Sequence, residues 1–308
     1  ADISISVPRF TGLKQYMDFP LEMLREYIDW TFFFLAWEMK GTWPKILHDP
    51  SQGEAARKLF ADANEMLDEI IGRKMLQANG VVGLWPANSD GDDIFLYTGE
   101  NRKTELGRFY CLRQQDKKRK GSPNLCLSDF VAPRESGRAD YCGAFAVTAG
   151  IGIEKWKKQF AEEHNDYKVI LIEALADRLS EAFAEYLHLQ VRKELWGYSP
   201  EENLTLPQLL HADYRGIRPA PGYPACPEHS EKKTLFSLLK AEETGMSLTE
   251  HFAMYPNASV CGYYFAHPGA RYFGIEKISR DQVEDYARRK GVSAEYVEKF
   301  LPANLNYK

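Results

Sequence analysis

The stretch from Arg218 to Pro227, RPAPGYPACP, constrains the chain more than any other, because four of its ten residues are proline. Each proline fixes its own φ, lacks a backbone donor and pushes the preceding residue toward extended geometry. The stretch can therefore form neither a helix nor the interior of a sheet, and its backbone groups need partners elsewhere in the protein or on a ligand. Gly222 is the one permissive point, where another group can approach the backbone closely.

Arg218 places a planar, permanently charged guanidinium at the head of this stretch, and such a group suits a carboxylate or a phosphate. Composition leaves two interpretations equally open: a rigid connector whose arginine pairs with a nearby acid, and a ligand-binding loop. A helix predicted at residues 230–243 follows directly, and the positive end of its dipole would favour an anionic group beside the loop.

The 308 residues could form one large domain or two small ones, and a composition with 44% hydrophobic and 27% charged residues is that of a soluble globular protein. A net charge of −5 gives no reason to expect a nucleic-acid partner. The most apolar run, residues 30–37, is far shorter than the roughly 20 residues that span a bilayer, so no membrane partner is expected. The first residue is Ala1 rather than Met, which suggests processing or excision from something longer.

The cysteines are odd in number and scattered, as expected for reduced thiols in a cytoplasmic protein. They are Cys111, Cys126, Cys142, Cys226 and Cys261. Cys226 and His229 form half of a zinc pattern, but no second pair lies at a ligand-like distance, so no metal site is expected.

Periodicity and turn residues predict an extended arm over residues 1–19, followed by helices, hairpin-like strands and then mixed elements. Helices are predicted at residues 21–39, 53–77, 154–164, 166–195, 204–214, 230–243, 280–290 and 293–300. Strands are predicted at residues 80–86, 94–98, 108–113, 125–131, 141–148, 259–267 and 270–275. No convincing domain boundary is visible, and this order indicates one α+β domain over residues 1–308 with a largely antiparallel sheet.

Acidic residues stand out in two of these helices. Asp29 lies in the middle of residues 21–39, a helix predicted to be apolar almost all round, where a buried carboxylate needs a partner or a ligand. Residues 166–195 carry acids every fourth position, and stacked like charges cost about 0.2–0.5 kcal/mol per pair. The acids are Glu173, Asp177, Glu181 and Glu185. A solvated face is the simpler interpretation, and an acidic strip held for a partner, a histidine or a cationic ligand is the alternative.

Three further features have a plain and a functional interpretation. The aromatic residues near the last strands are ordinary core or a wall for a flat ring, and they are Tyr263, Tyr264, Tyr272 and Phe273. Gly150-Ile151-Gly152 is a weak nucleotide-binding pattern that we interpret as a strand-to-helix turn. The basic residues 117–120 form a solvated turn or a docking patch for an acidic partner.

The stretch from Arg218 to His229 resembles the signature loop of the activation domain of cobalamin-dependent methionine synthase. Further blocks are similar to the same family, in order and almost end to end, at residues 24–31, 81–88, 129–133, 174–178 and 282–291. The resemblance implies a single C-shaped α+β domain with a twisted, largely antiparallel sheet flanked by helices. It implies the C-terminal reactivation module of a methyltransferase of methionine biosynthesis, 5-methyltetrahydrofolate–homocysteine methyltransferase.

In that family the parent enzyme carries methyl groups on cobalamin, which is occasionally oxidised to inert cob(II)alamin. The resemblance implies that this module binds S-adenosylmethionine and positions its methyl group for transfer to cob(I)alamin on a separate module. Flavodoxin or a flavoprotein reductase would supply one electron. Because the sulfonium already activates the methyl group, the module's task is positioning, and no catalytic side chain is expected.

The resemblance also implies which residues bind the ligand: Asp29, Arg218, Ala220, Gly222, Tyr223, Tyr272 and Phe273. Arg218 would hold the carboxylate of S-adenosylmethionine, and Asp29 would meet its cationic end. Asp177 and Glu181 would face the cobalamin module and take up the histidine released from cobalt.

Other modules of the parent enzyme have no counterpart here, since the cobalamin-ligand motif Asp-x-His-x-x-Gly and the zinc-binding cysteines are missing. The chain alone is therefore not expected to make methionine. One alternative is a regulatory module that senses S-adenosylmethionine without passing on its methyl group. Another is a Rossmann-type methyltransferase built on Gly150, which would need a parallel sheet; the alternating hairpin strands argue against it.

Overall fold

The computed structural model describes residues 4–119 and 121–307, so Lys120 of the predicted basic loop and the first residues of the predicted arm lie outside it. Its centre is an antiparallel sheet with the strand order β4-β3-β2-β5-β8, to which β1 is added along β2. These strands are β1 (Gly12–Phe19), β2 (Gln77–Asp90), β3 (Asp93–Tyr97), β4 (Glu105–Tyr110), β5 (Asp140–Ile151) and β8 (Ser259–Tyr264). A separate small sheet pairs β6 (Ser247–Leu248) with β7 (Met254–Tyr255). The predicted antiparallel sheet is confirmed, and with it the hairpin of β2 and β3.

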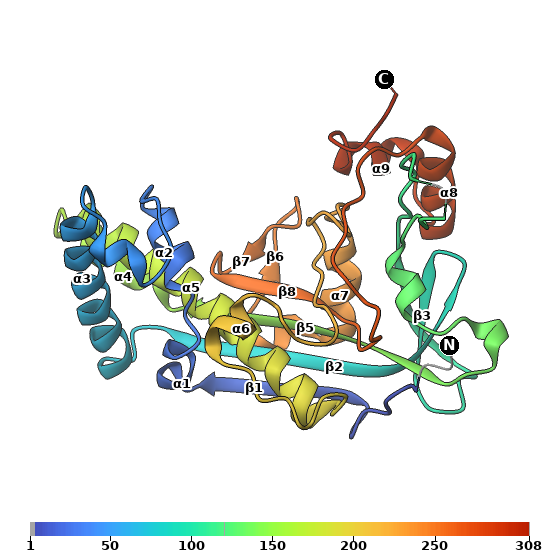
Figure 1. The fold of residues 1–308 in the computed structure, drawn as a ribbon, viewed down its shortest axis with the longest axis horizontal. Helices are drawn as coiled ribbons and strands as arrows, with labels where there is room; N and C mark the ends of the chain where they lie inside the picture. Colours follow the sequence, from blue (N-terminus) through green and yellow to red (C-terminus); the bar gives the residue numbers. More distant parts are fainter. Residues whose placement is uncertain (1–3, 120, 308) are drawn as a thin grey trace.

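The helices gather at the two ends of the sheet and on its faces. They are α1 (Leu21–Arg25), α2 (Trp30–Ala36), α3 (Gly53–Gly72), α4 (Ile153–Glu162), α5 (Asp166–Gln190), α6 (Leu206–Leu210), α7 (Glu231–Leu239), α8 (Arg280–Lys290) and α9 (Ala294–Phe300). Figure 1 shows α2, α3 and α4 at one end and α8 and α9 at the other, both rising on the same side of the sheet, which gives the expected C shape. No helix within the described residues is long and apolar enough to cross a membrane.

The long strand β2 organises the sheet. One of its edges pairs with β5 from Gln77 to Ala87. The other edge is divided, because β1 pairs with residues 78–84 and β3 pairs with residues 87–90. A single strand therefore joins the two ends of the molecule.

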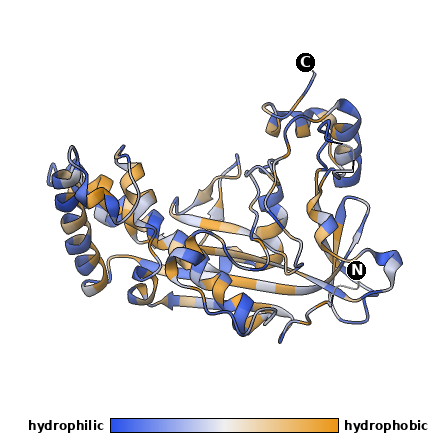
Figure 2. Cartoon of the chain, in the orientation of Figure 1, coloured by the Kyte–Doolittle hydropathy of each residue, from blue (hydrophilic) through white to orange (hydrophobic). Residues whose placement is uncertain are grey.

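Both faces of the central strands are covered, so β5 is buried at every position between its two terminal residues. Alternate side chains of a strand point to opposite faces. Phe145 and Val147 accordingly pack in the core that contains α5, whereas Ala144 and Ala146 pack in the core that contains α7. Figure 2 shows hydrophobic residues along the central strands and many hydrophilic residues on α3 and α8. A third, smaller core holds α8 and α9 together.

The proline-rich stretch lies along the outer edge of β8. Tyr263 donates its backbone N–H to the carbonyl of Pro219 at 2.8 Å, and Ile217 and Phe265 exchange two backbone hydrogen bonds of 3.1 Å. Proline accepts hydrogen bonds but cannot donate them, so it is tolerated at a sheet edge. The structure thereby answers where the backbone groups of this stretch find their partners.

The predicted strand at residues 270–275 is wrong. After the turn at Pro268 and Gly269 the chain does not return to β8, because the proline-rich stretch already occupies that edge. Instead Ile275 donates its N–H to the carbonyl of Pro224 at 2.7 Å, so this segment follows the loop.

The single helix predicted at residues 21–39 is also wrong, because it is broken into α1 and α2. Asp29 has an extended backbone and its side chain accepts a hydrogen bond from the N–H of Thr31 at 2.9 Å. It is therefore the N-cap of α2, a role for which aspartate is well suited. Its carboxylate is only partly buried, so the buried carboxylate that was expected to need a partner or a ligand is not found there. Phe32 is exposed while Phe33 and Phe34 are buried, so α2 is not apolar on all sides in the sense expected.

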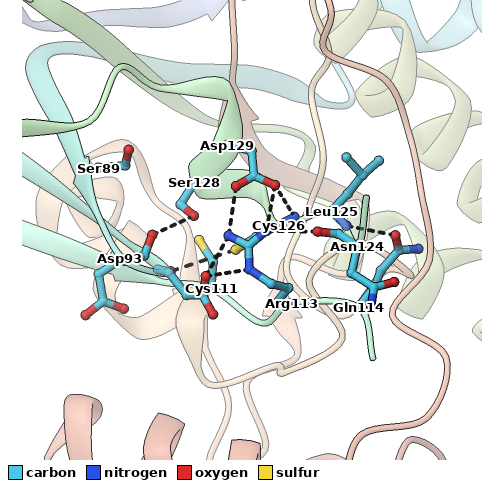
Figure 3. A network of polar contacts seen from close by, with 12 residues as sticks. Ser89, Asp93, Cys111, Arg113, Gln114, Asn124, Leu125, Cys126, Ser128 and Asp129 are labelled. Atoms are coloured by element: carbon cyan, nitrogen blue, oxygen red, sulfur yellow. Dashed lines mark hydrogen bonds and ion pairs between the residues drawn. The ribbon is translucent and has the colours of Figure 1, made fainter. Parts of the chain in front are cut away.

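The strand predicted at residues 125–131 is a short 3-10 turn from Leu127 to Phe130. Asp129 accepts a hydrogen bond from the N–H of Cys126 at 2.8 Å, which closes the turn. The guanidinium of Arg113 donates two hydrogen bonds of 2.8 Å to the same carboxylate (Figure 3). A local carboxylate thus competes successfully with strand pairing.

Other local predictions fared better. The long helix predicted at residues 166–195 is α5 followed by a π-helical turn, Val191–Leu195. The helix predicted at residues 53–77 ends at Gly72, and the chain enters β2 at Gln77. Gly152, with a φ of 90°, is the N-cap of α4, which confirms the strand-to-helix turn. Since the sheet is antiparallel, the Rossmann alternative is excluded.

The close approach of the proline-rich stretch to β8 can be tested by adding a methyl group between them. A Cβ atom at Gly262 would lie 2.7 Å from the carbonyl oxygen of Pro219 and 3.0 Å from the Phe145 ring. We expect Gly262→Ala to lower the free energy of unfolding by about 1–3 kcal/mol, as overpacking does, in urea denaturation. Gly72→Ala is the control, since its Cβ would meet nothing within 4 Å. An equal response of both variants would contradict the close crossing.

The capping role of Asp29 can be tested by a second measurement of stability. Asp29→Ala should cost about 0.5–2 kcal/mol of unfolding free energy because the N–H of Thr31 loses its acceptor. Asp29→Asn keeps a capping oxygen and should remain close to the parent protein in the same urea titration. A large loss in the asparagine variant would show that the charge, and not the cap, stabilises α2.

Candidate functional site

A cleft of about 640 Å³ lies where α2, α5, the proline-rich stretch and β8 meet. Its volume is typical of sites for small organic ligands. Among the predicted site residues, those in its wall are Asp29, Glu181, Arg218, Ala220, Tyr223, Tyr272 and Phe273. Gly222 and Asp177 are not in the wall, so the structure gathers most but not all of the predicted residues around one space.

Gly222 shapes the loop without lining the cleft. It has a φ of 93° and donates its N–H to the carbonyl of Cys226 at 2.7 Å. A Cβ atom here would lie 2.5 Å from the ring of His229, so only glycine fits this turn. His229 thus packs over Gly222, while the thiol of Cys226 is buried 4.0 Å from the hydroxyl of Tyr263.

Arg218 is held by a ring of polar partners. Its Nη2 donates to Oε2 of Glu185 at 2.6 Å, and its Nη1 donates to the hydroxyl of Tyr214 at 2.5 Å and to Nδ1 of His188 at 3.2 Å. Burial alone would lower the pKa of Arg218, but the Glu185 carboxylate and neighbouring tyrosines outweigh that effect and raise it. The guanidinium is therefore a fixed positive charge, and the connector interpretation and the ligand interpretation of Arg218 turn out to be compatible.

His188 is a neutral spacer behind this arginine. Burial, with the positive charges of Arg192 and Arg218, holds its pKa well below the usual range. Because a guanidinium can only donate, Nδ1 of His188 must accept, and Nε2 carries the proton toward the hydroxyl of Tyr198, 3.2 Å away. One tautomer is thus favoured by the surroundings.

The acids of α5 pass from solvent into the cleft. The side chain of Glu173 is 45% exposed and pairs with Lys157 at 2.5 Å, whereas Glu185 is buried against Arg218. Between them, Glu181 lines the cleft and Asp177 is partly buried. Burial raises the pKa of Asp177, and the neighbouring carboxylates add to that effect. The interpretation as a solvated face holds only for the outer end of this strip.

Aromatic residues divide between core and cleft. Tyr263 and Tyr264 are fully packed core residues. In contrast Tyr272 is 51% exposed, and its hydroxyl accepts the backbone N–H of Arg218 at 3.1 Å. Tyr223 and Phe32 are also exposed and lie in the cleft wall. These three rings offer flat, accessible surfaces for stacking.

The positive end of α7, expected to await an external anion, is already supplied by the protein. Glu228 accepts hydrogen bonds from both the N–H and the hydroxyl of Ser230 at 2.7 Å. Lys290 of α8 pairs with Glu228 and with Glu231. This network ties α8 to α7.

Sequence reasoning missed several residues of the wall. They are Tyr27, Phe32, Phe145, Arg178, Ala182, Glu185, Leu210, Pro219, Pro224, Ala225, Val260 and Cys261. Glu185 had been noticed as part of the acidic strip, but its spacing alone did not show which acid meets Arg218. Glu185 and Arg218 are 33 positions apart in the sequence.

Comparison with known proteins agrees with this geometry. Residues 20–291 match the family model described as vitamin B12 dependent methionine synthase, activation domain. A solved structure described as "Crystal Structure of the MetH Reactivation Domain bound to AdoHcy" is 52% identical, with a TM-score of 0.97 over 99% of this chain and 94% of that one. The chain belongs to the family of methionine synthase activation domains.

Proposed function

We propose that the cleft binds S-adenosylmethionine and positions its methyl group for transfer to cob(I)alamin on a separate module during reductive reactivation. The observation that carries this proposal is the meeting of Arg218, Tyr223 and Tyr272 with acidic residues in one cleft. The relative at 52% identity is described with AdoHcy, the product that remains when S-adenosylmethionine has lost its methyl group. An amino-acid carboxylate, a cationic sulfur and a flat adenine match the three kinds of group in the wall.

Each group has a defined task in this proposal. The guanidinium of Arg218 holds the ligand carboxylate by charge-assisted hydrogen bonds, and Asp29 supplies negative charge to the cationic sulfonium. Tyr272 and Phe273 lie beside the adenosine, and Ala220 and Tyr223 supply contacts from the loop, which Gly222 shapes. The sulfonium itself activates the methyl group, so these residues bind and orient it.

The partners follow from the family. Residues 1–308 would act as one domain of a cytoplasmic methyltransferase, docked on the cobalamin-binding module and served by flavodoxin or a flavoprotein reductase. Asp177 and Glu181 would face the cobalamin module, where they could accept the histidine released from cobalt. A module that only senses S-adenosylmethionine is the alternative; it would bind the ligand but leave added cob(I)alamin unmethylated.

Replacing Arg218 tests the ligand assignment. Arg218→Ala should weaken S-adenosylmethionine binding at least about tenfold, because a charge-assisted contact is worth roughly 1.5–3 kcal/mol. Calorimetric titration measures the affinity, and Arg288→Ala, an exposed arginine on α8, is the matched control. Near-native affinity in Arg218→Ala would remove the carboxylate assignment.

Asp177 tests the docking assignment separately, since it does not line the cleft. Asp177→Ala should leave S-adenosylmethionine affinity within about twofold of the parent protein, well below the tenfold that 1.4 kcal/mol represents. The double variant, Asp177→Ala with Glu181→Ala, should impair the reductive methylation of cobalamin that is supplied on its module. The absorbance of the cobalamin follows this reaction. Unchanged activation in the double variant would return these acids to a plain surface role.

A further inference from the structure

Lys290 of α8 lies in a buried network that reaches the proline-rich stretch. Its side chain is 10% exposed, and its Nζ lies 2.8 Å from Oε1 of Glu231 and donates to the hydroxyl of Ser230 at 2.7 Å. Nζ also pairs with Glu228, whose side chain is 2% exposed. Because Glu228 directly follows Pro227, the ammonium group of Lys290 connects α8 to the C-terminal end of the proline-rich stretch.

Two buried carboxylates share this one ammonium group. Within residues 4–119 and 121–307, Lys290 is the one basic residue that pairs with either Glu228 or Glu231. The other hydrogen bonds to Glu228 come from neutral donors, which are the N–H and hydroxyl of Ser230 and the hydroxyl of Tyr286 at 3.2 Å. Removing one partner of a buried ion pair leaves an uncompensated charge. Without Lys290, the carboxylate of Glu228 would therefore have to move toward water or take up a proton.

A short hydrogen-bonded segment connects Glu228 with the cleft. Two backbone hydrogen bonds close the turn that carries Tyr223, one from Gly222 to the carbonyl of Cys226 at 2.7 Å and one from Cys226 to the carbonyl of Tyr223 at 2.9 Å. The ring of His229, the residue after Glu228, packs over Gly222 and leaves no room for a side chain there. Since Tyr223 lines the cleft, a displacement of Glu228 would change the shape of the cleft wall.

We propose that Lys290 is a positioning residue for the ligand: it holds Glu228, fixes the end of the proline-rich stretch and thereby sets the affinity of the cleft from a helix that does not line it. The inference rests on the proposed function, which names the ligand as S-adenosylmethionine. Lys290 is not in the cleft wall. Anchoring of α8 alone is the competing explanation, because Lys290 also joins α8 to α7 through Glu231.

Arg289, the preceding residue of α8, provides a matched control. Its side chain is 12% exposed, close to the 10% of Lys290, and it joins α8 to Asp93 of β3 and to the carbonyl of Cys111 at 3.1 Å. Neither of these partners belongs to the proline-rich stretch. Lys290→Met and Arg289→Met each remove one buried cation from α8, but only the first removes a contact with Glu228.

Calorimetric titration with S-adenosylmethionine gives the affinity of the parent protein and of both variants, and urea denaturation gives their stability. Lys290→Met should weaken the affinity by about fivefold or more, the lower end of the usual coupling between two sites. Arg289→Met should keep the affinity within about twofold of the parent, as expected for independent sites, although its stability should fall as well. Amide hydrogen exchange at Gly222, measured by NMR, should become faster in Lys290→Met only.

Glu228→Gln provides a second variant in case Lys290→Met does not fold in a thermal melt. It removes the charge at the end of the proline-rich stretch, while Glu231 still pairs with Lys290 and keeps α8 anchored to α7. Its affinity for S-adenosylmethionine should fall by more than about twofold. The double variant, Glu228→Gln with Lys290→Met, should bind no more weakly than Lys290→Met, because two residues that act through one contact are not additive.

Three results would overturn the assignment. Near-parent affinity in the folded variants of Lys290 and Glu228 would reduce Lys290 to an anchor of α8. Equal losses of affinity in Lys290→Met and Arg289→Met would show that the attachment of α8 as a whole, and not the contact with Glu228, supports the cleft. Failure of the parent protein to bind S-adenosylmethionine would reject the proposed function itself, and the role of Lys290 with it; this outcome is distinct from the other two because they require parent binding.

Discussion

The site depends on the pairing of the proline-rich stretch with the edge of β8. The carbonyl of Pro219 accepts a hydrogen bond from Tyr263, which fixes the start of the stretch against the outermost strand β8. The carbonyl of Pro224 accepts another from Ile275, in the segment that follows β8. These few contacts hold the loop in place against the edge of the sheet. Arg218 and Tyr223 are consequently presented from a fixed backbone, which is what a positioning site requires.

Behind the loop, charge is arranged in layers. Arg218 is compensated by Glu185. Seven residues farther along the chain, in the π-helical turn that follows α5, the fully buried Arg192 is held by three hydrogen bonds to Glu202, and its guanidinium lies 3.9 Å from the ring centre of Tyr214. His188 contacts the guanidinium of Arg218, and its pKa is held well below the usual range by burial and by the positive charges of Arg192 and Arg218. The outer arginine can therefore face a ligand while the inner one stabilises the π-helical turn.

Sequence reasoning reached the fold class and the antiparallel sheet, because hydrophobic alternation and turn chemistry are local properties, and the resemblance to a family supplied seven of the residues that line the cleft. It failed where a distant group decided the outcome. Residues 270–275 have strand-like alternation, but the edge that they would join is occupied by a loop 50 residues earlier. Asp29 was expected inside a helix because its apolar neighbours conceal a cap. The buried partner of Arg218 could be suspected as an acid of α5 but not identified, since helical spacing does not show which turn meets the loop.

The divided strand β2 also has a consequence for how a large partner can engage the molecule. Its 14 residues span roughly 45 Å at the usual rise per residue, and they carry the helical arm of α3 near one end and the hairpin with β3 at the other. One strand, buried along nearly its whole length, therefore runs between the two arms of the C. A macromolecule that contacts both arms has to bridge a distance of the order of the length of this strand.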